Sequence, residues 1–412
     1  MHASTQSDSS KTIGSTTQSN KVTNEQAIMG EDLKEEKSCC TWPKVIIAVI
    51  LLAVLGIVIW QFAPIDSTLD KVLPDFDKTF SPTVTPLDET MAPTSTPTQD
   101  SIFNRCSDDD TSCCVNGLSN ICDLGVDDIL YATVHNAMAT TDDGFFVGPN
   151  HLRSFEGALQ RGYRGLSLDL CNCNGVYQFC HGFCGAGDRA LIPTMTSINT
   201  FLDDNPNEVL MIQLEITNKA GLEVDLNDFY ALLTQIDGLT SKFYEHPAID
   251  IAWPTLRDVV RDNKRILFFH YNGINCRDTP CPPGMHFWYE YAAETEFSFS
   301  SVDALRDPVA SCTVTRGGNL EREPASRTFF SINNFVTSPS QSAAEVVNEY
   351  EFAKNKMAEC KTQYNNLDAN SILVDFWQSG DMVQLQQDTN EARGAAAARR
   401  RQRNQRHQVR RG

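Results

Sequence analysis

The sequence lacks several features that would define its class at once. It has no Asn-x-Ser/Thr site, so we expect no N-linked glycan. It also has no glycine-rich loop of the nucleotide-binding type and no internal repeat. Basic residues are few, since 34 Lys and Arg stand against 53 Asp and Glu, for a net charge of −19. Because nucleic-acid binders need clustered positive charge, we predict no nucleic-acid partner.

Cysteine, in contrast, is abundant. The 412 residues include 14 cysteines, which is too many for a typical cytosolic enzyme and indicates an oxidising compartment. The 22 Phe, 10 Tyr and 5 Trp are enough for a large hydrophobic core, which excludes a chain that is disordered throughout. The length suits one large domain or two of average size.

One long apolar run predicts a membrane anchor. Residues 45–63 read VIIAVILLAVLGIVIWQFA, 19 residues without a charge, and as a helix they would span about 28 Å, the thickness of one hydrocarbon core. Trp42 and Trp60 lie near its two ends, as interfacial aromatics do. The alternative is a cleaved signal peptide, but 44 preceding residues are many for one and Ala63-Pro64 is a poor cleavage site. A single transmembrane helix is therefore the favoured interpretation.

Composition divides the rest of the chain. Residues 1–44 are polar and predict a disordered cytoplasmic tail, and the Pro/Thr-rich residues 64–105 predict an extended stalk. We expect the globular domain at 106–387. Residues 388–412 are expected to form an arginine-rich disordered tail, with binding of anionic lipid headgroups as the alternative. Twelve of the 14 cysteines follow the apolar run, so we place the globular domain in a lumen or outside the cell.

Strand-like and helix-like segments alternate within the globular domain. Apolar runs predict strands, and stretches with helical spacing lie between them. This alternation favours an α/β fold with a parallel sheet. The size and the missing glycine-rich loop favour a TIM-barrel-like barrel over a doubly wound sheet. The strands are expected at 129–134, 165–170, 209–216, 265–269, 328–336 and 372–377, and the helices at 152–161, 197–204, 229–236 and 343–360.

Polar residues follow or end three of these strands. His135 and Asn136 come directly after the first, Asp169 lies near the end of the second, and His181 follows in the next loop. Glu215 lies near the end of the third. The carboxyl ends of parallel barrel strands meet on one face, so these side chains should converge there. Two histidines can act as general base and general acid, and the oxygen ligands suit a hard cation such as calcium.

Each of these residues also has a structural interpretation. A single histidine after a strand often makes only a structural hydrogen bond, Asp169 could pair with a buried arginine, and Glu215 could cap a helix. His270 and Trp377 end two further strands, where they would contact a substrate or pack in the core.

Four cysteines surround His181 in the segment CNCNGVYQFCHGFC. Their spacing is compatible with a zinc site, but the oxidising compartment favours disulfides that brace the loop. We also expect Cys276 to pair with Cys281. A further group should tie down the start of the domain, with a connectivity that the sequence does not specify: Cys106, Cys113, Cys114 and Cys122.

Several of these segments resemble a known family. The stretch 134–216 is similar to the X-type catalytic domain of phosphatidylinositol-specific phospholipases C, and most to the divergent PLC-like phosphodiesterases that are secreted or membrane-anchored. The motifs that carry the resemblance are ATVHNAM, RGYRGLSLDL, CHGFC and FLDDNPNEVLMIQLEI, with weaker similarity in RILFFHYN, AAETEFSF and SILVDFWQSGDMV. The resemblance implies a distorted TIM barrel over most of 106–387.

The resemblance also implies roles for single residues. His135 matches the first catalytic histidine, which contacts the phosphoryl group or acts as base, and His181 matches the general acid. Calcium is implied as the cofactor, with Asn136, Asp169 and Glu215 at the ligand positions of the eukaryotic enzymes. We expect the substrate to be contacted by Arg164, His270 and Trp377 as well.

The sequence departs from the family pattern at one position. Ser167 stands where the eukaryotic enzymes carry a glutamate. Because no PH, C2 or EF-hand signature is present, the intracellular signalling type is not expected. The expected function is a phosphoric diester hydrolase that cleaves phosphatidylinositol-like lipids at a membrane surface. The alternatives are a phosphodiesterase for other glycerophospho- or lysolipid diesters, and an inactive lipid- or glycan-binding ectodomain, which Ser167 would favour.

Overall fold

The computed structural model describes residues 105–106, 113–217, 222–271, 280–317 and 329–409. The predicted cytoplasmic tail, transmembrane segment and stalk lie outside these residues, except for Arg105, and stay predictions. Within the described part of the chain, no helix combines the length and the apolar character needed to cross a bilayer.

Strands and helices alternate along the described chain, which confirms the α/β prediction. The strands are β1 Tyr131–Val134, β2 Gly165–Cys173, β3 Val176–Cys180, β4 Asp188–Ala190, β5 Leu210–Thr217, β6 Ile266–Tyr271, β7 Met285–Phe287, β8 Ala292–Thr295, β9 Val314–Arg316, β10 Phe329–Asn333 and β11 Ser371–Val374. The helices are α3 Phe155–Arg161, α4 Leu191–Asp204, α5 Leu226–Leu233, α6 Leu256–Arg261, α7 Trp288–Tyr291, α8 Val302–Arg306, α9 Pro308–Ser311, α10 Gln341–Val347, α11 Tyr350–Gln363 and α12 Met382–Val409.

The strands form a single sheet in the order β7-β6-β5-β2-β1-β11-β10-β8-β9, with β3 and β4 as a side branch on β2. The pairings from β7 through to β8 are all parallel. The first strand pairs with the last, as in a barrel. The order ends at β7 and β9, and among the described residues no strand pairing joins these two ends. The sheet is therefore an open, barrel-like one, which agrees with a distorted barrel rather than a closed one.

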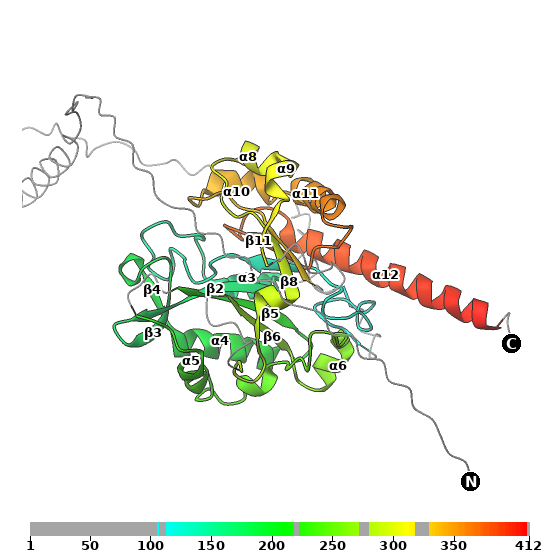
Figure 1. Ribbon diagram of the computed structural model, residues 1–412, viewed down its shortest axis with the longest axis horizontal. Helices are drawn as coiled ribbons and strands as arrows, with labels where there is room; N and C mark the ends of the chain where they lie inside the picture. The colour runs from blue at the N-terminus through cyan, green and yellow to red at the C-terminus, as the bar shows by residue number, and fades with distance from the viewer. Residues whose placement is uncertain (1–104, 107–112, 218–221, 272–279, 318–328, 410–412) are drawn as a thin grey trace, which may run out of the picture. The chain divides into compact units, whose positions relative to one another are not determined.

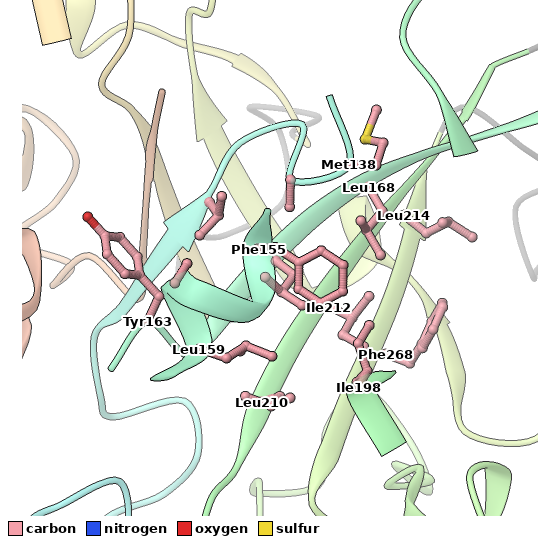
Figure 2. Close-up of a cluster of buried hydrophobic side chains, with 14 of the residues drawn as sticks. Met138, Phe155, Leu159, Tyr163, Leu168, Ile198, Leu210, Ile212, Leu214 and Phe268 are labelled. Carbon is pink, nitrogen blue, oxygen red and sulfur yellow. The ribbon is translucent and has the colours of Figure 1, made fainter. Parts of the chain in front are cut away.

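The two faces of the sheet bury different side chains. Alternate residues of a strand point to opposite faces, so Leu166, Leu168 and Leu170 of β2 all face outward. They pack against the helices together with Phe155 of α3 and Ile198 of α4 (Figure 2). Each such buried side chain contributes about 1.5–3 kcal/mol, so this layer dominates the stability of the fold.

The inner face is aromatic at one end and polar at the other. Phe269 and Phe329 pack with Trp253 on this face. Phe269 pairs in register with Gln213, and two residues farther along β5 Glu215 lies opposite Asp169 of β2. The inner face thus becomes polar toward the carboxyl ends of the strands, where the candidate site residues were predicted.

The helix predicted over 343–360 is two helices. α10 ends at Val347 and α11 begins at Tyr350. Asn348 lies between them, and its Nδ2 donates to the carbonyl of Asp375 at 2.8 Å. The side chain thereby fixes the turn between the helices to the end of β11, a tertiary contact that helical periodicity does not reveal.

The prediction of a disordered tail over 388–412 is wrong for residues 388–409, which belong to α12 (Figure 1). Asn390 is 2% exposed and exchanges two hydrogen bonds with the backbone of Leu130. Arg393 donates to the carbonyls of Asp128 and Ala369. The domain therefore extends beyond 387. Residues 398–408 are exposed.

Truncation tests this new boundary. A chain that ends after Ala398 keeps the contacts of Asn390 and Arg393, whereas a chain that ends after Gln387 loses all four of these hydrogen bonds. At about 1 kcal/mol for each bond, we expect the shorter chain to lose about 4 kcal/mol of unfolding free energy relative to the longer one. Urea unfolding followed by near-UV circular dichroism measures the difference, and equal midpoints would contradict it.

Candidate active site

The predicted catalytic and metal-binding residues line one cavity at the carboxyl ends of the strands. Its volume is about 220 Å³. The structure brings together His135 and Asn136 after β1, Asp169 of β2, His181 after β3, and Glu215 of β5. The other residues that line this cavity include Asn150, Phe297, Phe335 and Asp375.

His135 is held on two sides. Its Nδ1 lies 2.9 Å from Oδ1 of Asp375, which follows β11. Its ring stacks on Phe335, with ring centroids 3.8 Å apart and an angle of 8° between the planes. Because an ionised carboxylate only accepts hydrogen bonds, Nδ1 carries the ring proton and is the donor of the hydrogen bond to Asp375. The second ring nitrogen, Nε2, is then the one that can take up a proton.

His181 contacts Asn136, the residue that follows His135. Nε2 of His181 lies 3.2 Å from Nδ2 of Asn136. Burial lowers the pKa of His181, and the nearby His135 lowers it further, while the carboxylate of Asp375 partly offsets both effects. A protonated His181 is therefore a stronger acid than a free imidazolium, as suits a group that gives its proton to a leaving oxygen.

Asp169 and Glu215 are neighbours on adjacent strands. They face each other in the parallel register of β2 and β5. Together with Asn136 they offer an amide oxygen and two carboxylates, which are the kind of ligands that calcium prefers. Ser167 lies two residues before Asp169 on the same face, and its buried Oγ has no hydrogen-bond partner among the described residues. These residues are thus of the type that binds calcium, but the ligand set has one carboxylate fewer than that of the eukaryotic enzymes, because Ser167 replaces a glutamate.

Two disulfides brace the loop that carries His181. Cys171 is joined to Cys180 and Cys173 to Cys184. Three of these sulfurs lie close enough to suggest a metal site, but all are consumed in disulfides. The prediction of disulfides over zinc is confirmed.

The other cysteines of the described domain also form disulfides. At the start of the domain the pairing is Cys106–Cys114 and Cys113–Cys122. Cys281 is disulfide-bonded, whereas Cys276, its predicted partner, lies outside the described residues. The sequence did not indicate the fifth described disulfide, Cys312–Cys360.

Arg164 does not belong to the site. It directly precedes β2 and so lies beyond the amino end of that strand, five residues before Asp169. Its Nε donates to Oε2 of Glu208 at 2.6 Å, and its Nη1 donates to the carbonyls of Leu159 and Tyr163. Arg164 is 1% exposed, and its guanidinium holds the start of the strand. The predicted contact with substrate is therefore wrong.

His270 and Trp377 are structural too. On β6, Tyr271 pairs in register with Glu215 and shares its face, so His270 points to the other face. Its Nε2 lies 3.1 Å from Sγ of Cys281. Trp377 is 6% exposed and its Nε1 donates to the carbonyl of Arg153. Core packing, the alternative considered for both residues, is what the structure shows.

The structure adds residues that the sequence did not single out. Asp375 lies near the end of the last predicted strand, 372–377, and the rule that selected Asp169 and Glu215 could have selected it. Asn150 and His151 lie in a long loop with no local signal. His151 is fully buried, its Nε2 lies 2.6 Å from the carbonyl of His135, and its Nδ1 accepts from the backbone of Trp377. Burial lowers the pKa of His151 to about 4, so the ring stays neutral.

A family model decides the classification. The model of the PI-PLC X family, described as PI-PLC X 1, matches residues 121–390. The chain belongs to the PI-PLC X family. This confirms the resemblance that the sequence motifs carried, and the match also extends past 387 into α12.

Curated relatives of this PI-PLC X chain include two that carry the same domain name. PI-PLC X domain-containing protein 1 of Arthroderma benhamiae is 30% identical over 192 residues, which is 44% of this chain and 58% of the relative. A PI-PLC X domain-containing protein of Arabidopsis thaliana is 23% identical over 263 residues, 60% of this chain and 57% of the relative. The chain thus spans less than two thirds of the length of either relative.

Solved structures with partial similarity include two bacterial enzymes. The phosphatidylinositol-specific phospholipase C of Listeria monocytogenes matches with a TM-score of 0.45 at 16% identity, over 66% of this chain and 94% of that one. A mutant of the Staphylococcus aureus phosphatidylinositol-specific phospholipase C matches with a TM-score of 0.44 at 14% identity, over 65% of this chain and 94% of that one.

The buried His151 makes the stability of this PI-PLC X domain depend on pH. The unfolded chain binds a proton at His151 near pH 6.5, whereas the folded chain does so only near pH 4. Its contribution is thus present above pH 6.5 and is lost as the pH falls toward 4, by about 3 kcal/mol. We expect His151→Gln to have a flatter stability profile between pH 7 and 4 in urea unfolding. The exposed His407 supplies the control, since His407→Gln should leave the profile as in the wild type.

Proposed function

We propose that this PI-PLC X domain is a phosphoric diester hydrolase that cleaves phosphatidylinositol-like lipids. One observation carries the proposal. Two histidines from different loops line the same small cavity, one of them paired with a carboxylate, beside two further carboxylates. A base, an acid and a site for a hard cation are the groups that attack on a phosphodiester requires.

His135 is the proposed base. With Nδ1 donating to Asp375, the free Nε2 takes the proton from the attacking hydroxyl of the inositol headgroup. The imidazolium that forms is stabilised by Asp375 at 2.9 Å. General base catalysis of this kind contributes about 10²–10⁴-fold to a rate.

His181 is the proposed acid. In its protonated form it gives a proton to the oxygen of the departing diacylglycerol, so that the P–O bond breaks without leaving an alkoxide. Intramolecular attack of the hydroxyl on phosphorus leaves a cyclic inositol phosphate as the first product. Calcium is the proposed cofactor, held by Asn136, Asp169 and Glu215, and it would neutralise charge on the phosphoryl oxygens.

Exposed aromatic residues around the cavity support a lipid substrate. Phe297 lines the cavity and is 42% exposed. Phe183, next to the cavity-lining Gly182, is 50% exposed. Phe146 is 73% exposed, and its backbone N–H donates to the carbonyl of Ala186, three residues after Phe183. Large apolar side chains exposed around a polar cavity are typical of a surface that meets a membrane.

The proposed location follows from the disulfides. Five are described in the domain, and such bonds persist in oxidising compartments. This supports a luminal or extracellular domain that residues 45–63 tether to the membrane as a single-pass anchor.

Turnover of phosphatidylinositol vesicles by the full chain tests the proposal. We expect release of soluble inositol phosphate, a loss of at least about 10²-fold in His135→Ala and in His181→Ala, and a loss on calcium chelation. His270→Ala, a buried histidine outside the cavity, is the matched control and should keep its activity if it folds.

Other outcomes separate the alternatives. Turnover of other glycerophosphodiesters or lysolipids, but not of phosphatidylinositol, would favour the second candidate activity. Saturable vesicle binding by a folded chain that turns over none of these lipids would favour an inactive binding domain. Full activity in the presence of chelator would remove calcium from the proposal without removing the histidine pair.

A further inference from the structure

The buried side chain of Asn150 contacts a partner of each of the two histidines of the candidate site. Asn150 lies in the loop between β1 and α3 and is 1% exposed. Its Nδ2 donates to Oδ1 of Asp375 at 2.8 Å, and its Oδ1 accepts from Nδ2 of Asn136 at 3.4 Å. Because Asp375 also holds His135 and Asn136 also meets His181, a continuous chain of polar contacts joins the two histidines.

The ionised carboxylate of Asp375 determines which group donates and which accepts in each of these hydrogen bonds. An ionised Asp375 only accepts, so Asn150 must turn its Nδ2 toward it. The planar amide then presents Oδ1 on its other side, where it accepts from Asn136. An aspartate at this position would set an acceptor oxygen against Asp375, and an alanine would remove one hydrogen bond from Asp375 and one from Asn136. An amide thus satisfies both neighbours in a way that neither replacement does.

The backbone of Asn150 is fixed as firmly as its side chain. Its N–H donates to the carbonyl of Ala139, and its carbonyl accepts from the N–H of Phe376, each at 2.8 Å. Phe376 follows β11 with φ 47°, in the left-handed region that bulky residues rarely adopt, and Asn136 after β1 also has φ 47°. Such strain persists where the surroundings hold it and is common at functional sites. Asn150 contacts both of these residues.

We propose that Asn150 is a positioning residue that keeps the His135–Asp375 pair aligned with Asn136 and His181. The loop between β1 and α3 supplies this side chain, so its packing determines how the ends of β1 and β11 face each other. The kinetic consequence rests on the proposed function, whereas the structural consequence does not.

A spectroscopic signature of His135 tests the structural consequence. The full chain is labelled with ¹⁵N-histidine, and the Nδ1–H proton of His135 is assigned by its loss in His135→Gln. Hydrogen bonding to Asp375 should move this proton downfield and slow its exchange with water. In Asn150→Ala we expect an upfield shift and exchange at least about tenfold faster, because the carboxylate of Asp375 is no longer held in line with His135.

Two variants make the result specific to the amide. Asn150→Asp keeps the size of the side chain but removes the donor, so it should change the resonance as Asn150→Ala does. Asn390→Ala is the matched control, because Asn390 is equally buried and also makes two hydrogen bonds, but to the backbone of Leu130. If the first two variants do not fold, Asn150→Ser, which replaces the amide with a single hydroxyl, takes their place. An unchanged His135 resonance in a folded Asn150 variant would overturn the proposal.

Kinetics supply the second test. If the wild type cleaves phosphatidylinositol, Asn150→Ala should lower kcat about 100-fold and leave KM within about twofold, since misalignment affects the reacting geometry more than binding. Wild-type kcat in a variant with an altered His135 resonance would contradict a positioning role. If the wild type cleaves no lipid, the proposed function fails, while the resonance still decides whether Asn150 holds the pair.

Discussion

The parallel pairing of β1 with β11 is the constraint on which the site depends. Its register sets Val134 opposite Val374, so the next residues, His135 and Asp375, come to lie side by side although they are distant in the chain. The N–H of His135 donates to the carbonyl of Val374 at 3.0 Å and continues the pairing past the strand ends. A slip of one residue would turn one of the two side chains to the outer face and separate the pair.

The parallel arrangement of the strands explains why part of the site could be predicted from the sequence. His135, Asn136, Asp169 and Glu215 lie at the carboxyl ends of strands that their apolar patterns made visible, and parallel strands bring those ends together. His181 was selected as the histidine in the loop that follows the second strand, and two disulfides hold that loop at the cavity. Strand positions and fold class were therefore readable from periodicity, and the family from motifs.

The remaining features depend on tertiary contacts that periodicity does not encode. Without the register of β5 and β6 the sequence does not say that His270 faces away from Glu215. Asn150 lies in a loop, where only its contacts with Asp375 reveal it. The arginines of α12 made residues after 387 look disordered, whereas the helix is fixed through a few polar contacts, such as those of Asn390 with Leu130 just before β1. Closure of a barrel likewise depends on pairings that local patterns do not specify.

The central claim is that the two histidines act on opposite sides of one phosphodiester, through attack by a hydroxyl of the substrate itself. Phosphorus-31 NMR of the first product from a soluble short-chain phosphatidylinositol tests this most directly. The account predicts that a five-membered cyclic inositol phosphate appears before any phosphomonoester. A phosphomonoester that forms from the start, with no cyclic intermediate, would contradict it and would mean that water is the attacking group.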